Sequence, residues 1–490
     1  MSEAPALDRD DFRQLALTAL ALAHDHLYGM RDRPVFEPMK PDERRALLEH
    51  ALPDAGRDPH AILELFRDAV LTHPMGNGHP RFFGWVNSPP APLGILADFL
   101  AAAMNPSCAG GDHAAIYVER AAVRWLMELV GFPTASSMGL LVSGTSVATI
   151  VALAAARHRA AAVHGWDVRA EGLQGGHPRL RLYVTEEGHS CLRKAAELLG
   201  LGASAIRTIP ADDRFAMDVR ALEHAIVADR RAGDIPFCVA ASAGTVGTGA
   251  IDPLAALADL CAREQTWLHV DGAYGALGIL AAERRERYDG MARVDSLALD
   301  PHKWLSVPVE CGAVFVRDGA LLRDSFSLVP AYLRTEEGKG FGGLPWFSEY
   351  GVQQTRGFRA LKLWMVLQHL GRAGVSRIVE RHLALAQQLA RMVDDAPDLE
   401  RLAPVELSIV AFRYVPPALR GDDPRLDALN KRIMEQLQSE GAAFLTNTSV
   451  RGRFALRACI LHYGTTEEDV TALVDIVRRT GAALTTTPSP

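Results

Sequence analysis

Two short apolar runs, each followed at once by charged residues, constrain the fold of this chain more than any other feature. Residues 267–270 precede Asp271, and residues 294–299 precede the tetrapeptide Asp-Pro-His-Lys at 300–303. Apolar runs of this length predict buried strands. From residue 81 onward, β-rich runs of this kind alternate with Ala- and Leu-rich helical stretches. This alternation predicts an α/β fold with a mostly parallel sheet and helices on both faces.

Asp271 and Lys303 have the two functional groups that pyridoxal 5'-phosphate (PLP) needs from a protein. Ligands of open α/β sheets bind at the carboxyl ends of strands, where both residues are expected. A lysine amine forms a Schiff base with PLP, and a carboxylate keeps the pyridine nitrogen protonated. Taken singly, such a lysine is usually a solvated loop residue and such an aspartate a turn or a helix cap. Their joint positions favour a PLP site.

Two further segments fit the same site. Residues 142–146 (Val-Ser-Gly-Thr-Ser) end an apolar run and open a helix expected over 147–157. Their hydroxyls and free N–H groups at a helix N-terminus predict a phosphate site, although an ordinary helix cap is the alternative. His189 follows a strand expected over 182–185 and precedes a helix expected over 191–199, so its ring could stack on a flat cofactor. The alternative for His189 is a solvated loop histidine.

These motifs, in this order, resemble those of the group II PLP-dependent decarboxylases, and most closely the aromatic L-amino-acid branch, over residues 12–463. The resemblance implies the PLP-dependent transferase fold type I, which is aspartate aminotransferase-like. It has a seven-stranded central sheet and a smaller C-terminal α+β domain. We expect an N-terminal helical segment over 1–80, a large PLP-binding domain over 81–372 and a small domain over 373–490. The family pattern also implies a homodimer with its active site at the interface, in which the N-terminal segment packs on the partner.

The resemblance assigns roles to residues of this chain. Lys303 is expected to form the Schiff base, and His302 is expected close to the reacting centre. Asp271 is expected to pair with the pyridine nitrogen, with Ala273 under the ring and His189 stacked over it.

Four other residues complete the expected catalytic and cofactor sets. Thr145 and Ser146 match the phosphate-binding turn, and Ser242 matches a cofactor-contacting threonine whose hydroxyl it keeps. Tyr332 matches a tyrosine of the active-site lid that is implicated in protonating the substrate Cα. Relatives that produce aldehydes often carry phenylalanine there, so Tyr332 favours simple decarboxylation.

The segment 83–89 matches the substrate-pocket strand of the family, which implies that Trp85, Val86 and Ser88 contact the substrate. Val86 and Asn87 stand where the aromatic branch has an aromatic residue and a proline. An aromatic substrate is therefore implied, while a non-aromatic amino acid remains open.

The expected reaction is decarboxylation of an L-amino acid such as Trp, 5-hydroxy-Trp, Tyr, dopa or Phe. Loss of the carboxylate leaves a quinonoid carbanion, which is reprotonated to the amine. The alternatives are a PLP-dependent aromatic aldehyde synthase, an aminotransferase, and a catalytically silent PLP-binding protein.

The net charge and the spacing of the cysteines limit the kinds of partner and binding site that are expected. With 52 basic and 59 acidic residues the net charge is −7, and no basic block suggests nucleic acid as a partner. Neither a signal peptide nor a membrane-spanning run is apparent, so a cytoplasmic protein without membrane contact is expected. The six cysteines form no C-x-x-C pair, which suggests neither disulfides nor a metal site.

Overall fold

The computed structural model describes residues 7–328 and 342–486 of the chain. These residues form two compact units. Unit 1 consists of Met1–Trp85, Arg391–Glu400 and Phe412–Pro490, and unit 2 consists of Val86–Ala390 and Arg401–Ala411. Unit 1 thus combines segments from both ends of the chain. The three-part division at residues 80 and 372 stays a prediction.

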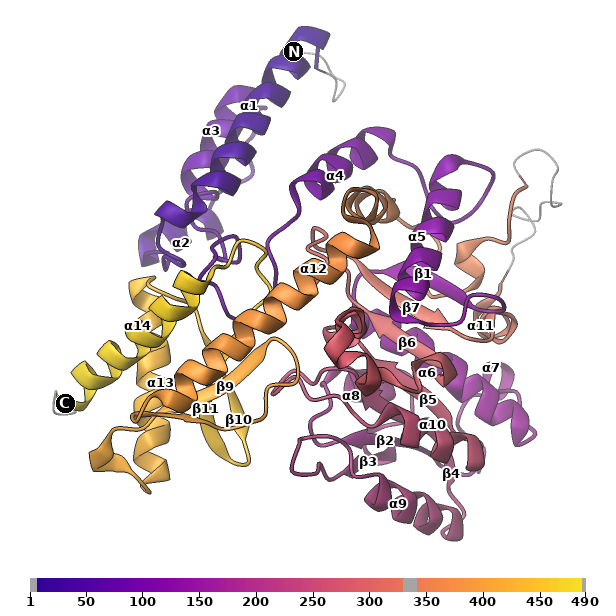
Figure 1. Ribbon diagram of the computed structural model, residues 1–490. Coiled ribbons are helices and arrows are strands. Elements are labelled where there is room, and N and C mark those ends of the chain that lie inside the picture. The colour runs from indigo at the N-terminus through magenta and orange to yellow at the C-terminus, as the bar shows by residue number, and fades with distance from the viewer. Residues whose placement is uncertain (1–6, 329–341, 487–490) are drawn as a thin grey trace. The chain divides into compact units, whose positions relative to one another are not determined.

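Unit 2 contains a seven-stranded sheet with the order β1-β7-β6-β5-β4-β2-β3 (Figure 1). Its strands are β1 (Met138–Val142), β2 (Leu180–Thr185), β3 (Ile206–Ile209), β4 (Ile235–Ser242), β5 (Trp267–Asp271), β6 (Ser296–Leu299) and β7 (Gly312–Val316). Strands β3, β2, β4, β5 and β6 pair in parallel, whereas β7 is antiparallel to both of its neighbours, β6 and β1. The predicted mostly parallel sheet is confirmed.

The central strands are buried along their whole length, which explains why their sequences are mostly apolar. Every residue of β2, β4, β5, β6 and β7 is buried. The two runs predicted as strands become β5 and β6, but β6 begins at Ser296 rather than at Val294. A 3-10 turn over Met291–Arg293 leads into that strand, and the Asp295 carboxylate accepts the amide N–H of Leu268 at 2.8 Å.

Helices α5 (Ala114–Val130), α6 (Thr145–Val163), α9 (Val219–Arg231), α10 (Leu254–Arg263) and α11 (Gly319–Phe326) pack against the sheet of unit 2 (Figure 1). The unit also contains α4 (Pro92–Met104), α7 (Val168–Glu171), α8 (Cys191–Leu198) and most of α12 (Ala360–Asp395). Within α12, Gly371 has a non-helical conformation with a positive φ of 58°, which divides α12 into two helical parts.

Helix α6 lies in the core of unit 2. Among the described residues it is the one helix long and apolar enough to cross a membrane, although no such run was expected from the sequence. It packs against strands β4 to β7, and 56% of its most apolar window is buried. Its apolar composition is therefore accounted for by packing against the sheet.

Unit 1 contains the N-terminal helices α1 (Arg9–Gly29), α2 (Pro41–Leu48) and α3 (Pro59–Ala69). All three lie within the helical segment that was predicted over 1–80. The unit also holds α13 (Asp423–Glu440), α14 (Glu467–Thr486) and most of a four-stranded sheet. That sheet has the order β10 (Thr446–Val450), β11 (Arg453–Cys459), β9 (Ile409–Tyr414) and β8 (Leu399–Arg401).

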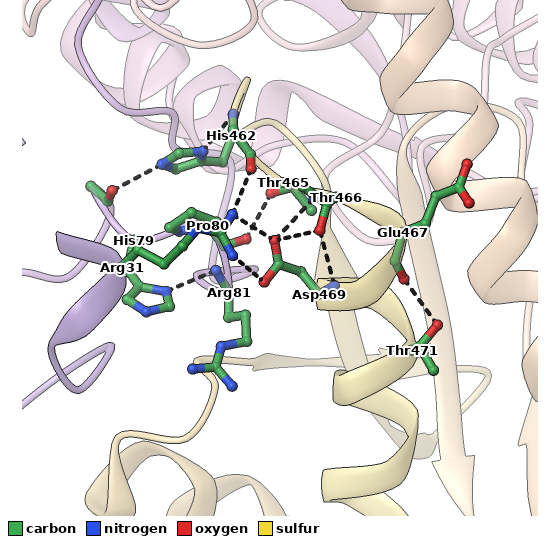
Figure 2. Close-up of polar contacts among 12 residues, drawn as sticks. Arg31, His79, Pro80, Arg81, His462, Thr465, Thr466, Glu467, Asp469 and Thr471 are labelled. Carbon is green, nitrogen blue, oxygen red and sulfur yellow. Dashed lines mark hydrogen bonds and ion pairs between the residues drawn. The ribbon is translucent and has the colours of Figure 1, made fainter. Parts of the chain in front are cut away.

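A polar network within unit 1 joins the segment after α1 to the start of α14 (Figure 2). Arg31 donates to both carboxylate oxygens of Asp469 at 3.1 Å. His462 Nε2 lies 2.9 Å from the Gly78 carbonyl oxygen, and His79 Nδ1 accepts the Arg81 amide N–H at 2.9 Å. Burial lowers the pKa of both histidines to about 4, so each is neutral at pH 7.

Candidate active site

The carboxyl ends of five strands meet at one edge of the unit 2 sheet. Strands β1, β6, β5, β4 and β2 run in the same direction, since β7 reverses the direction twice between β6 and β1. In the register of these strands Ser242 lies opposite Asp271, which in turn lies opposite Ala298. The turns after these strands therefore bring the predicted cofactor residues to one edge, as expected for a ligand site in such a sheet.

Lys303 lies in a turn just after β6 and forms an ion pair with Asp300. Its Nζ is 3.0 Å from Asp300 Oδ2, and its amide N–H donates to the Asp300 carbonyl at 2.9 Å. The other carboxylate oxygen, Oδ1, accepts the amide N–H of Thr145 at 2.8 Å. The Lys303 side chain is 22% exposed, so the amine is accessible to a ligand, whereas Asp300 is buried.

Asp271 is a buried carboxylate with weak partners. Its Oδ1 accepts the Ala273 amide N–H at 3.1 Å, and its Oδ2 lies 3.9 Å from the Cys191 thiol. Burial raises the pKa of Asp271, and the nearby Lys303 charge opposes that rise. A buried carboxylate without a tight cationic partner is costly, and a protonated pyridine nitrogen would supply that partner.

The start of α6 fits a phosphate group. Thr145 Oγ1 is buried and has no hydrogen-bond partner among the described residues, and it lies at a helix N-terminus. Ser146 is exposed beside it. A side chain at Gly312, the first residue of β7, would place its Cβ 2.4 Å from Gly144 Cα. Glycine is therefore required there for β7 to pass so close to this turn.

The two predicted histidines differ in their surroundings. His189 is exposed, and its Nδ1 accepts the Cys191 amide N–H at 3.2 Å. His302 is largely enclosed, with Nδ1 2.7 Å from the Cys311 carbonyl oxygen, and burial lowers its pKa. Its carbonyl oxygen also accepts the Ser88 hydroxyl at 3.2 Å.

Ser242 and Ala273 are buried at the ends of neighbouring strands. The Ser242 amide N–H donates to Asp252 at 2.6 Å, and the same carboxylate accepts the Met217 amide N–H at 2.7 Å. Burial raises the pKa of Asp252 to about 6. Asp252 thus fixes the end of β4, from which the Ser242 side chain is presented.

The residues predicted to contact the substrate belong to both units. Val86 and Ser88 are buried residues of unit 2, whereas Trp85 belongs to unit 1 and is 48% exposed. The Trp85 amide N–H donates to Thr446 Oγ1 at 3.3 Å. Tyr332 lies outside the described residues. The catalytic and substrate-binding roles of all these residues stay predictions.

The sequence interpretation gave no role to Asp300 or Cys191, which the structure places among the predicted cofactor residues. Asp300 carried a signal, because it stands three residues before Lys303 in the same turn. Cys191 carried none, because its contact with Asp271 joins residues 80 positions apart.

Three ligand atoms, one each from His189, Cys191 and Asp271, lie within 4.8 Å of one another, a spacing that could hold a metal ion. Two features weigh against a metal at this position. Burial, followed by the negative charge of Asp271, raises the pKa of the Cys191 thiol to about 12, while a metal binds the thiolate. The His189 Nδ1 is also engaged with a backbone amide.

The comparisons with a family model, with relatives and with a solved structure agree with one another. The model of the pyridoxal-dependent decarboxylase conserved domain matches residues 41–415. The aromatic-L-amino-acid decarboxylase of Bacillus atrophaeus is 34% identical over 472 residues, covering 96% of this chain and 95% of the relative. The human acidic amino acid decarboxylase GADL1 is 30% identical, covering 90% of this chain and 85% of the relative. The crystal structure of Oryza sativa TDC with PLP and tryptamine superimposes with a TM-score of 0.91 at 29% identity, covering 99% of this chain and all of that one.

Proposed function

Because the chain belongs to the pyridoxal-dependent decarboxylase family and is a PLP-dependent carboxy-lyase acting on an amino acid, we propose that its substrate is an aromatic L-amino acid. The products are the corresponding amine and carbon dioxide. The observation that carries this proposal is the 34% identity to an aromatic-L-amino-acid decarboxylase along nearly the whole length of both chains.

The residues at the strand ends have complementary tasks in this proposal. The Lys303 amine holds the cofactor covalently, and the Asp271 carboxylate stabilises the protonated pyridine nitrogen. The N-terminus of α6 and the Thr145 hydroxyl bind the phosphate. When bound, PLP supplies an electron sink for the negative charge that develops at the substrate Cα.

His302 is suited to hold a proton near the Lys303 amine. Its Nδ1 is engaged with the Cys311 backbone, which leaves Nε2 3.7 Å from Asp300 Oδ2. Burial lowers the pKa of His302, so the ring is neutral at pH 7 and can accept a proton at Nε2. We assign the later protonation of the substrate Cα to Tyr332.

The proposal includes a cytoplasmic homodimer. Apolar side chains on the N-terminal helices support an arm that packs on a second copy, since Leu17 and Leu20 of α1 and Ile62 of α3 are each at least half exposed. Exposed apolar residues grouped on one segment are typical of protein interfaces.

A second candidate is a decarboxylase of an acidic amino acid. Val86 and Asn87 make the expected pocket strand less aromatic, and the human GADL1 relative is named for acidic substrates.

The decisive experiment supplies PLP-loaded protein with Trp, 5-hydroxy-Trp, Tyr, dopa, Phe, His, Glu and Asp. Carbon dioxide, amine and aldehyde are followed by mass spectrometry. Aromatic amine with equimolar carbon dioxide is the expected result. Amine from Glu or Asp alone would favour the second candidate, and aldehyde with ammonia would replace simple decarboxylation by the oxidative reaction.

A further inference from the structure

The carboxylate of Asp300 contacts two groups that PLP is proposed to use. One oxygen accepts the Thr145 amide N–H at the start of α6, where the phosphate is proposed to bind. The other lies 3.0 Å from the Lys303 Nζ, which is proposed to react with the aldehyde. The Asp300 side chain thus contacts both an amide proposed to bind the phosphate and the amine proposed to react with the aldehyde.

The position of Asp300 is fixed by the fold and not by a flexible surface contact. Its side chain is only 4% exposed. Its amide N–H donates to the Ala273 carbonyl at 3.2 Å, and its carbonyl accepts the Lys303 amide N–H at 2.9 Å. The main chain is held on both sides, and the carboxylate itself is held by the Thr145 amide N–H and the Lys303 amine.

We propose that Asp300 is a built-in counter-ion of the cofactor-free protein, which occupies the phosphate position and holds the Lys303 ammonium, and thereby restrains PLP uptake. The inference rests on the proposed binding of PLP at Lys303. It identifies Asp300 as a positioning residue that controls cofactor loading.

Asp300 opposes the binding of PLP through three physical effects. The N–H groups at a helix N-terminus that are bonded to a carboxylate must be released before they bind phosphate. An amine held in an ion pair with a carboxylate must leave that pair before it attacks an aldehyde, and only the neutral amine attacks. In that attack a C=N bond forms and water leaves, so the ammonium proton must first be lost. Finally, a bound phosphate would meet a like charge at Asp300.

The test is Asp300→Asn, which keeps one oxygen acceptor for the Thr145 amide N–H and replaces the carboxylate oxygen beside Lys303 by a neutral amide NH2 group. Apoprotein is mixed with PLP in a stopped-flow instrument, and the visible absorbance of lysine-bound cofactor is recorded. We expect faster uptake and a PLP Kd about tenfold lower than in wild type, because the variant has no like charge facing the phosphate and no ion pair at the Lys303 amine.

A second readout does not involve PLP. Reductive methylation of the apoprotein, quantified by mass spectrometry of the Lys303 peptide, should be faster in Asp300→Asn, because the Lys303 amine is no longer held in the ion pair with Asp300. Inorganic phosphate should also bind the variant more tightly than wild type in calorimetry.

Asp98→Asn is the matched control. Asp98 is paired with Lys362 at 3.1 Å in the same unit, so this change removes the carboxylate of a comparable Asp–Lys pair. We expect wild-type PLP uptake and Lys303 methylation in this variant.

Asp300→Ser provides an independent variant should the Asn substitution fail to fold, as judged by circular dichroism, because serine also accepts hydrogen bonds at helix N-termini. Unchanged or slower uptake in a folded Asp300 variant would overturn the inference. Wild-type protein that gives no visible absorbance with PLP would instead contradict the proposed function.

Discussion

Two buried carboxylates, one in each unit, differ in how completely their hydrogen-bonding capacity is used. Asp469 of unit 1 binds Arg31 through both oxygens and also accepts the Thr466 amide N–H at 3.0 Å. Asp271 of unit 2 has one amide N–H and a thiol at 3.9 Å. A saturated buried carboxylate stabilises the chain that surrounds it, whereas an undersaturated one marks a position where a ligand completes the coordination.

The largest expected effect comes from Lys303→Ala. Without the amine the cofactor cannot be held covalently, so turnover should fall by more than about 1,000-fold. The measurement is carbon dioxide release together with the visible absorbance of lysine-bound PLP, which should disappear. Lys194→Ala, which removes an exposed lysine from α8, should retain both signals. Substantial turnover in Lys303→Ala would remove the proposed role of this lysine.

The Asp271→Asn substitution tests the comparison between Asp271 and Asp469, because it should lower turnover and raise the stability of the folded protein. Loss of the anion beside the pyridine nitrogen removes a buried charge pair, which is expected to lower turnover by about 100- to 1,000-fold. Burial raises the pKa of Asp271 in the cofactor-free protein. The folded state therefore keeps the Asp271 carboxyl group protonated to a higher pH than the unfolded chain does. The free energy of unfolding falls as the pH rises from the unfolded pKa to the folded pKa.

The asparagine side chain does not titrate, so the cofactor-free Asp271→Asn variant should be more stable than wild type at pH 7.5, within the roughly 0.5–2 kcal/mol typical of stabilising substitutions. Urea unfolding of both apoproteins measures this difference. A variant that loses both turnover and stability would show that Asp271 is a structural carboxylate like Asp469.

The strand ends of unit 2 could be predicted from the sequence, whereas the contacts between them could not. The run before Asp271 is apolar except at His269, and this local pattern predicted β5. The Asp300–Thr145 hydrogen bond joins residues 155 positions apart. It depends on β7 lying antiparallel between β1 and β6, and a strand order of this kind is not encoded in any local pattern.

In unit 1, Asp469→Ala should lower stability without removing the cofactor. The substitution leaves the Arg31 guanidinium and the Thr466 amide without their shared acceptor. The expected loss is about 2 kcal/mol in the free energy of unfolding, since Arg31 is half exposed and water replaces part of the interaction.

Differential scanning calorimetry measures this loss, and Asp475→Ala, at an exposed position of the same helix, is the control. The visible absorbance of lysine-bound PLP should be retained, because Lys303 and Asp271 are intact. Loss of absorbance in a folded Asp469→Ala protein would contradict the assignment of this carboxylate to structure.

The smallest expected effect is the pH dependence that the histidines of unit 1 produce. Burial lowers the pKa of His79 and His462 to about 4, whereas an unfolded histidine titrates near 6.5. The unfolded chain therefore binds more protons as the pH falls below 6.5, and stability present at higher pH is lost towards pH 4. Between pH 7.5 and pH 6 each histidine should reduce the free energy of unfolding by about 1 kcal/mol.

Urea titrations at both pH values should show a smaller difference in His462→Gln than in wild type, because glutamine does not titrate. An equal difference in the two proteins would mean that His462 does not contribute to the acid sensitivity of this network.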